Sequence, residues 1–127
     1  MISGKNYIGD KLSSTSSVTF KTFNPLINLE NDIIFFEASD SEIQKATKIA
    51  SEAFRHYKQV SAEDRARFLV QISDELNLIS DDIVNIYCKE TGLPEARCLG
   101  ELGRTINQLK SFANLLLEGS FQEVSID

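Results

Sequence analysis

Tryptophan is absent from this chain of 127 residues, which holds one histidine, one methionine, two cysteines and two prolines. A single histidine cannot complete a zinc site with Cys88 and Cys98, because these cysteines lie ten residues apart, outside any metal-binding spacing. Two cysteines without a secretion signal are typical of cytoplasmic thiols rather than of a disulfide framework. No apolar run approaches the roughly 18 residues of a membrane span. These scarcities predict a cytoplasmic chain with no membrane partner.

Basic residues are also in the minority, with 13 Lys and Arg against 19 Asp and Glu and a formal net charge of −6. Domains that bind nucleic acids by charge need a basic face, so we expect no nucleic-acid partner. The composition, 42% hydrophobic and 25% charged, is that of an ordinary globular domain. A chain of this length can form one core and not two.

Residues 1–38 have the pattern of short β-strands. We expect strands at residues 7–8, at 18–23, where apolar and polar residues alternate, and at 33–36, where the run is continuously apolar. Asn24 and Pro25 predict a turn between the last two strands, because the residue before a proline is pushed out of the helical region.

From residue 39 the hydrophobic period changes to 3.6, which predicts four helices. The first begins at a capping box formed by Ser39 and Glu42, the second at Ser61 and the third at Ser80. The fourth is expected from about Pro94 to Glu118. The third and fourth helices end at glycines that can adopt the left-handed conformation, Gly92 and Gly119.

Each of the three longer helices has an apolar row along one face; we expect the row of the second helix to be buried and that of the fourth to pack on the chain's own core. The rows are Ile43, Ala46, Ala50, Ala53, Phe54 and Tyr57 in the first, Leu69, Ile72, Leu76 and Ile79 in the second, and Cys98, Leu99, Leu102, Ile106, Leu109, Phe112, Ala113, Leu116 and Leu117 in the fourth. Residues 121–126 alternate again and predict a terminal strand. The expected fold class is therefore α+β: short strands, four helices and a last strand.

Side chains able to do chemistry are few. His56 lies about 120° around its helix from the apolar row, which predicts a surface position. Cys88 and Cys98 are expected to be packing thiols, because a nucleophilic cysteine needs a base beside it. Gly100 and Gly103 lie inside a predicted helix rather than after a strand, which excludes a phosphate loop. The residues by themselves predict no catalytic and no cofactor-binding site.

The order of the motifs nevertheless resembles the N-terminal segment of the aldehyde dehydrogenase superfamily over almost the whole chain. The most specific motif is E-T-G-L-P at residues 90–94, similar to the family's E-T-G-K-P turn, with Leu93 in place of the usual lysine. Four further segments are similar to family motifs in the same order: the opening strand at 4–9, the N-P turn at 22–25, the small-residue helix at 46–54 and the R-A-x-x-L helix at 65–69. The long helix is similar to that of NADP-preferring members that oxidise 2-oxoglutarate semialdehyde or fatty aldehydes.

This resemblance implies a much longer enzyme that oxidises an aldehyde to a carboxylate through a cysteine nucleophile and hydride transfer to NADP or NAD. Its catalytic residues and dinucleotide-binding segments lie beyond residue 127, and neither Cys88 nor Cys98 matches the catalytic motif. The chain alone is therefore expected to be inactive and to bind no cofactor. In such an enzyme residues 1–38 would be an N-terminal β-extension, residues 39–119 a four-helix segment of the α/β dinucleotide-binding domain, and residues 120–127 the start of the oligomerisation hairpin.

Glu90 is the position to which the resemblance gives a binding role. It falls in the last turn of the third helix, where the helix dipole disfavours an anion, and carboxylate and carbonyl oxygens suit hard cations. The family often holds a monovalent cation between a carboxylate at this turn and backbone oxygens near the N-P turn, here Thr22 and Phe23. The implied metal ligands are Thr22, Phe23 and Glu90; a solvated glutamate is the alternative.

The reverse face of the fourth helix predicts a partner. It aligns small residues, among them Ala96, Gly100, Gly103 and Ser111. A glycine inside a helix costs about 1 kcal/mol relative to alanine, so two on a merely solvated face would be an unexplained loss. We expect this face to contact the rest of a longer polypeptide or a second copy of the chain.

The alternative function is a stand-alone helical module that acts by protein interaction without catalysis, to which four capped helices with short connections are equally suited. A coding sequence that continues into a Gly-rich βαβ unit and a distant cysteine would favour the enzyme. A natural stop codon would favour the module.

Overall fold

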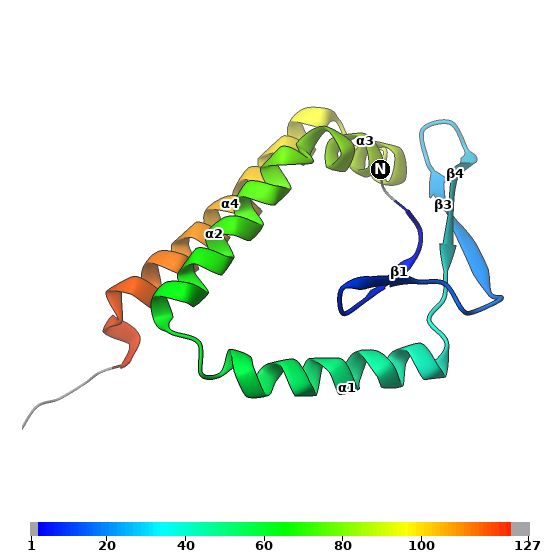
Figure 1. Cartoon of the computed structure of the whole chain (residues 1–127). Coiled ribbons are helices and arrows are strands. Elements are labelled where there is room, and N and C mark those ends of the chain that lie inside the picture. Colours follow the sequence, from blue (N-terminus) through cyan, green and yellow to red (C-terminus); the bar gives the residue numbers. More distant parts are fainter. Residues whose placement is uncertain (1–2, 123–127) are drawn as a thin grey trace, which may run out of the picture. The chain divides into compact units, whose positions relative to one another are not determined.

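A computed structural model describes residues 3–122 as four short strands followed by four helices (Figure 1). The strands are β1 (Asn6–Ile8), β2 (Lys11–Ser13), β3 (Thr19–Asn24) and β4 (Leu29–Phe36). The helices are α1 (Asp40–Tyr57), α2 (Ala62–Leu78), α3 (Ser80–Thr91) and α4 (Glu95–Glu118), followed by a 3₁₀ turn at Ser120–Gln122. The expected arrangement of short strands followed by four helices is confirmed.

The described residues form two compact units. The first unit contains residues 3–59 and 85–93, and therefore both strand pairs and α1; the second contains residues 60–84 and 94–122, and therefore α2 and α4. Within residues 3–122, no helix combines the length and the apolar character that a membrane span requires.

The strands of the first unit form two antiparallel pairs, β1 with β2 and β3 with β4. In the longer pair Phe20 lies opposite Phe35, and their rings stack with centroids 5.5 Å apart. Strand β2 was not predicted, because it is only three residues long and carries a single apolar side chain, Leu12. Strand β4 begins at Leu29, four residues before the expected start, because the polar residues at its beginning pair with the end of β3.

Gly4 lies so close to β4 that only a glycine fits. Its carbonyl accepts a hydrogen bond from the amide of Phe36 at 3.0 Å, and a Cβ at this position would overlap the carbonyl oxygen of Ile34. The side-chain amide of Asn6 donates to the carbonyl of Phe36 at 3.3 Å. The N-terminal residues therefore lie against the end of β4.

Helix α1 begins at the predicted capping box, and the rest of its unit covers little of its apolar row. Ser39 caps it, with a complete capping box between Ser39 and Glu42. Much of its apolar row is exposed, since Ile43 is 51% exposed and Phe54 62% exposed. Within its unit α1 packs mainly on the β1 region, where Ile49 contacts Gly9, and one short strand cannot cover a helix of 18 residues.

Helices α2 and α4 run side by side in opposite directions and make the largest helix contact of the chain (Figure 1). The residues that are fully buried between them are small. They are Ala66 and Ser73 on α2 and Cys98 and Ala113 on α4, each 2% exposed or less. Small residues let two helices approach closely, so the larger aliphatic side chains are left along the flanks of the pair.

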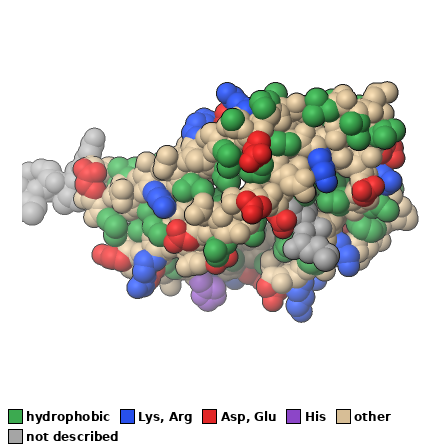
Figure 2. Space-filling model, turned by 90° about the horizontal axis from the view of Figure 1, so that it is seen from above, with side chains coloured by type: hydrophobic (Ala, Val, Ile, Leu, Met, Phe, Trp, Pro, Cys, Tyr) green, Lys and Arg blue, Asp and Glu red, His purple; other side chains and the backbone are tan. Residues whose placement is uncertain are grey.

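Because α2 and α4 pack so closely, the larger residues of their apolar rows are less buried than the sequence predicted. Ile79, Leu99, Phe112 and Leu117 are between 49% and 59% exposed, although the sequence predicted that they face the chain's own core. Leu69, Ile72 and Leu76 are half-buried. Figure 2 shows one face of the molecule, on which hydrophobic side chains lie at the surface between charges of both signs.

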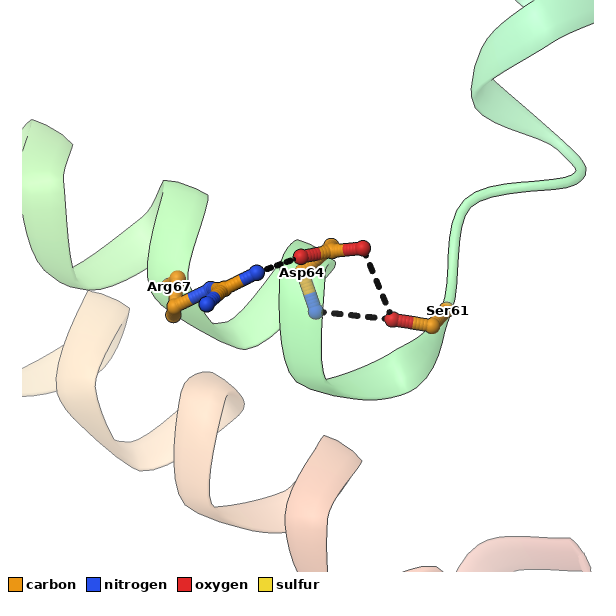
Figure 3. Close-up of polar contacts among 3 residues, drawn as sticks. All are labelled: Ser61, Asp64 and Arg67. Carbon is orange, nitrogen blue, oxygen red and sulfur yellow. Dashed lines mark hydrogen bonds and ion pairs between the residues drawn. The ribbon is translucent and has the colours of Figure 1, made fainter.

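The ends of α2 and α4 follow local sequence rules. Ser61 caps α2 through its hydroxyl, which accepts from the amide of Asp64 at 3.1 Å, and Arg67 pairs with the Asp64 carboxylate (Figure 3). Gly119 ends α4 in the left-handed conformation, with φ of 71°. Pro94 is the N-cap of α4 rather than its first residue.

The predicted terminal strand is wrong where the structure can test it. Phe121 and Gln122 lie in the 3₁₀ turn that continues from Gly119. Residues 123–126 lie outside the described residues, and the division of the chain at residues 38 and 119 stays a prediction.

Candidate functional site

The first polar cluster of the chain is built around Glu42, at the start of α1. One carboxylate oxygen accepts from the Ser13 hydroxyl and from the Thr15 amide, and the other accepts from the amide and the hydroxyl of Ser39. These bonds, the one from Ser13 above all, lower the pKa of Glu42 from 4.5 to about 2. A carboxylate with so low a pKa and both oxygens engaged is a poor general base. The cluster is therefore a structural link between the loop after β2 and α1.

Half of this cluster is predictable from the sequence. The capping box predicted the pair Ser39 and Glu42, and the structure confirms it. Ser13 and Thr15 were missed, because they lie 29 and 27 residues from Glu42 and only the folded hairpin brings them there.

The second candidate is the pair of turns that carries the predicted cation ligands, and both turns belong to the first unit. Gly92 follows α3 with φ of 70°, and a Cβ there would lie 3.0 Å from Pro25 and 3.3 Å from Leu26. The turn after α3 therefore packs directly on the N-P turn. Each turn is also closed locally: the Leu26 amide donates to the Asn24 side chain at 3.0 Å.

The three predicted cation ligands lie close in sequence to this contact. Glu90 is half-buried in the last turn of α3, and Thr22 and Phe23 precede the N-P turn in β3. The pairing of β3 with β4 shifts register between Lys21 and Phe23, at Thr22, whose hydroxyl accepts from the Asn31 amide at 3.1 Å. In the part of the chain that the structure describes, no three His, Cys, Asp or Glu side chains gather into a metal site.

The cysteines and the histidine, which were considered as nucleophiles and base, do not form a catalytic site in the described residues. Cys98 is 2% exposed between α2 and α4, as expected of a packing thiol, whereas Cys88 is half-buried in α3. His56 is exposed in the last turn of α1, as the sequence predicted. Gly100 and Gly103 lie inside α4, so their amides are part of the helix and cannot cradle a phosphate.

An apolar groove, which the sequence pattern does not predict, lies on the α2–α4 pair. It encloses about 290 Å³ and is lined by Leu69, Phe112, Leu115, Leu116 and Phe121. One sign of it was present in the sequence, since Leu115 points away from the main apolar row of its helix. Phe121 could not be assigned to it, because its alternating neighbours predicted a strand.

A sequence profile of the aldehyde dehydrogenase family matches residues 12–126. This chain belongs to the aldehyde dehydrogenase family. The match covers α1 to α4 and the turns at Pro25 and Gly92. The resemblance seen in the ordered motifs is thereby confirmed.

Two curated family members are similar over nearly the whole chain. Alpha-ketoglutaric semialdehyde dehydrogenase 2 of Azospirillum brasilense is 35% identical over 127 residues, and the match covers 99% of this chain and 24% of that protein. The alpha-ketoglutaric semialdehyde dehydrogenase of Acinetobacter baylyi is 31% identical, with 98% and 24% covered. The chain thus spans about a quarter of the length of these relatives, in their N-terminal part.

Solved structures of the family share the fold. A NAD-dependent benzaldehyde dehydrogenase from Corynebacterium glutamicum matches with a TM-score of 0.82 at 20% identity, over 91% of this chain and 25% of that one. A betaine aldehyde dehydrogenase from Staphylococcus aureus, solved with NAD+, matches with a TM-score of 0.79 at 20% identity, over 89% and 23%. The strands and helices of this chain therefore have the fold of an aldehyde dehydrogenase N-terminal segment.

Proposed function

We propose that this chain is the N-terminal scaffold segment of an NAD(P)+-dependent aldehyde dehydrogenase whose substrate is alpha-ketoglutaric semialdehyde, oxidised to the carboxylate. The observation that carries the proposal is the 35% identity over 127 residues with a quarter of the Azospirillum brasilense enzyme of that name. Within such an enzyme residues 39–119 belong to the cofactor domain and residues 120–127 begin the oligomerisation hairpin. We place the enzyme in the cytoplasm, where both thiols stay reduced.

The geometry supports a scaffold rather than a catalyst. Both oxygens of the buried Glu42 are engaged in hydrogen bonds, and Cys98 is enclosed between two helices. NAD(P)+ would accept the hydride in the complete enzyme, but the residues present here do not fit its phosphates, because Gly100 and Gly103 lie inside α4. What the chain does offer is apolar surface that its own residues leave uncovered.

The test is an assay of the purified chain with NAD+ and NADP+ in turn, and with alpha-ketoglutaric semialdehyde. We expect no reduced cofactor and no micromolar cofactor binding. The matched control is the double variant Cys88→Ala/Cys98→Ala. Cofactor reduction by the chain above that control would place an active site within these residues and contradict the scaffold proposal.

We further propose that Glu90 and the backbone oxygens of Thr22 and Phe23 contribute to a monovalent cation site. Two observations support it: the turn after Glu90 packs on the turn after Phe23, and β3 changes register at Thr22. Carboxylate and carbonyl oxygens are the donors that hard cations take. A cation there would also offset the unfavourable interaction of Glu90 with the C-terminal end of the α3 dipole.

The variant Glu90→Gln tests this site. We expect it to abolish the rise in melting temperature that potassium or sodium chloride gives over tetramethylammonium chloride at equal ionic strength. Glu118→Gln is the matched control, because Glu118 also ends a helix and its removal changes the same dipole interaction. Equal salt responses in wild type and Glu90→Gln would remove Glu90 from the site.

A further inference from the structure

The β3–β4 hairpin contains an irregularity at one of the residues proposed to bind the cation. Lys21 pairs with Ile34 and Phe23 with Glu30, so Thr22 alone lies opposite residues 31–33 of β4. Among the described residues of β3, Thr22 is the one without a partner in this register. A bulge disrupts the ladder locally, and bulges are frequent beside functional sites. The ladder alone therefore does not fix the strand at Thr22.

A side chain makes the contact that the ladder lacks at this point. The amide nitrogen of Asn31 donates a hydrogen bond to the hydroxyl of Thr22 at 3.1 Å, and both residues are half-buried. Asparagine is depleted in β-strands, because its short polar side chain competes for backbone hydrogen bonds. Asn31 nevertheless lies within β4, between the exposed acids Glu30 and Asp32. Its place at the bulge indicates a specific role there.

The segment that carries the two proposed carbonyl ligands is thus held at both ends. On the other side of Phe23, the side chain of Asn24 is 9% exposed and accepts from the Leu26 amide. We propose that Asn31 is a positioning residue for the cation site, which holds Thr22 by its hydroxyl and so orients the backbone carbonyl before a cation binds. This inference rests on the proposed cation site.

The physical basis of the inference is preorganisation. A binding group that loses conformational freedom on binding weakens the affinity, and a hydrogen bond formed in advance removes part of that cost. The atom of Asn31 that contacts Thr22 is the amide nitrogen, which is a donor and no ligand for a cation. Asn31 therefore acts on the site through Thr22.

The experiment follows the melting temperature of the full 127-residue chain as potassium chloride, and sodium chloride in a second series, replaces tetramethylammonium chloride at constant ionic strength. Asn31→Leu removes the donor at similar size. Thr22→Val removes the hydroxyl and keeps the backbone carbonyl. The matched control is Thr19→Val, because it makes the same change at an exposed threonine of the same strand that pairs with Phe36.

The informative quantity is the half-effect concentration, at which the cation gives half of its rise in melting temperature. We expect it to be about fivefold higher in Asn31→Leu and in Thr22→Val than in the wild type, as for the loss of one hydrogen bond. The double variant should be no worse than either single variant, because both remove the same bond. Thr19→Val should keep the half-effect concentration of the wild type.

A bond that only stabilises the hairpin would give a different result. Asn31→Leu would then lower the melting temperature equally at every cation concentration and leave the half-effect concentration unchanged. That outcome would overturn the positioning role of Asn31 and leave the proposed cation site standing. A wild-type chain whose melting temperature rises with neither salt would overturn both the site and this inference, and leave the scaffold function standing.

Discussion

The two units of the chain are stabilised internally by different interactions. In the first unit the carboxylate of Glu42 accepts hydrogen bonds from Ser13, Thr15 and Ser39, and Ile8 is the one buried hydrophobic residue of that unit among those described. In the second unit the buried contact consists of small side chains between α2 and α4. Hydrogen bonds to an ionised group depend on pH, whereas close packing depends on volume. The two units should therefore respond to different perturbations.

A larger side chain in the contact between α2 and α4 should have the largest effect on stability, and this effect should be confined to the second unit. Ala113→Leu adds a branched side chain at a position that is 1% exposed, where the two helices leave no room. We expect a loss of about 3 kcal/mol in the free energy of unfolding, at the upper end for overpacking. Urea unfolding followed by circular dichroism measures it. Asn114→Leu, on the exposed face beside it, should stay within about 0.5 kcal/mol. Equal losses in the two variants would contradict close packing at Ala113.

A change of pH should act through the first unit. The pKa of Glu42 is lowered from 4.5 to about 2, so its carboxylate stabilises the fold above about pH 4.5, and that contribution is lost as the pH falls through 2. Glu42→Gln should lower the melting temperature at pH 7 and flatten its fall between these values. Melting curves from pH 7 to pH 2 measure both effects. Glu52→Gln, at an exposed position on the same helix, is the control. If the melting temperatures of wild type and Glu42→Gln fell in parallel with pH, the hydrogen bonds of Glu42 would not link the β1–β2 hairpin to α1.

The smallest effect on stability, and of opposite sign, is expected at Gly103. A Cβ there would meet nothing within 4 Å, so Gly103→Leu should stabilise α4 by about 0.8 kcal/mol. We also expect the isolated chain to self-associate through the small-residue face that includes Gly103, and the leucine to prevent it. Light scattering at high protein concentration measures the association. A wild-type monomer that the substitution leaves unchanged would show that this face is no interface for the isolated chain.

Local rules in the sequence predicted the boundaries of the helices closely. Ser39, Ser61, Gly92 and Gly119 act through backbone groups a few residues away, so their effect does not depend on the rest of the fold. The family could be predicted for a similar reason, because its turn motifs occur in order along the chain. Strand β2 and the donors Ser13 and Thr15 could not be predicted, because their partners lie far away in sequence.

Burial was predicted least well, and the reason is physical. An apolar row shows which face of a helix avoids water, but not whether the same chain supplies the cover. Phe54 on α1 and Phe112 on α4 lie on such faces and remain 62% and 52% exposed. The contact between α2 and α4 instead buries the small residues Ala66 and Ala113, because helices that approach closely have no room for larger side chains.

The sequence by itself determined the order of the elements, the ends of the helices and membership in the aldehyde dehydrogenase family, because each of these depends on residues that are neighbours along the chain. The tertiary structure decided the rest: the hydrogen bonds that converge on Glu42, the packing of Gly92 on the N-P turn, and the groove lined by Leu115. Each of these joins residues that are distant in sequence, and such contacts form only when the backbone closes the intervening loops.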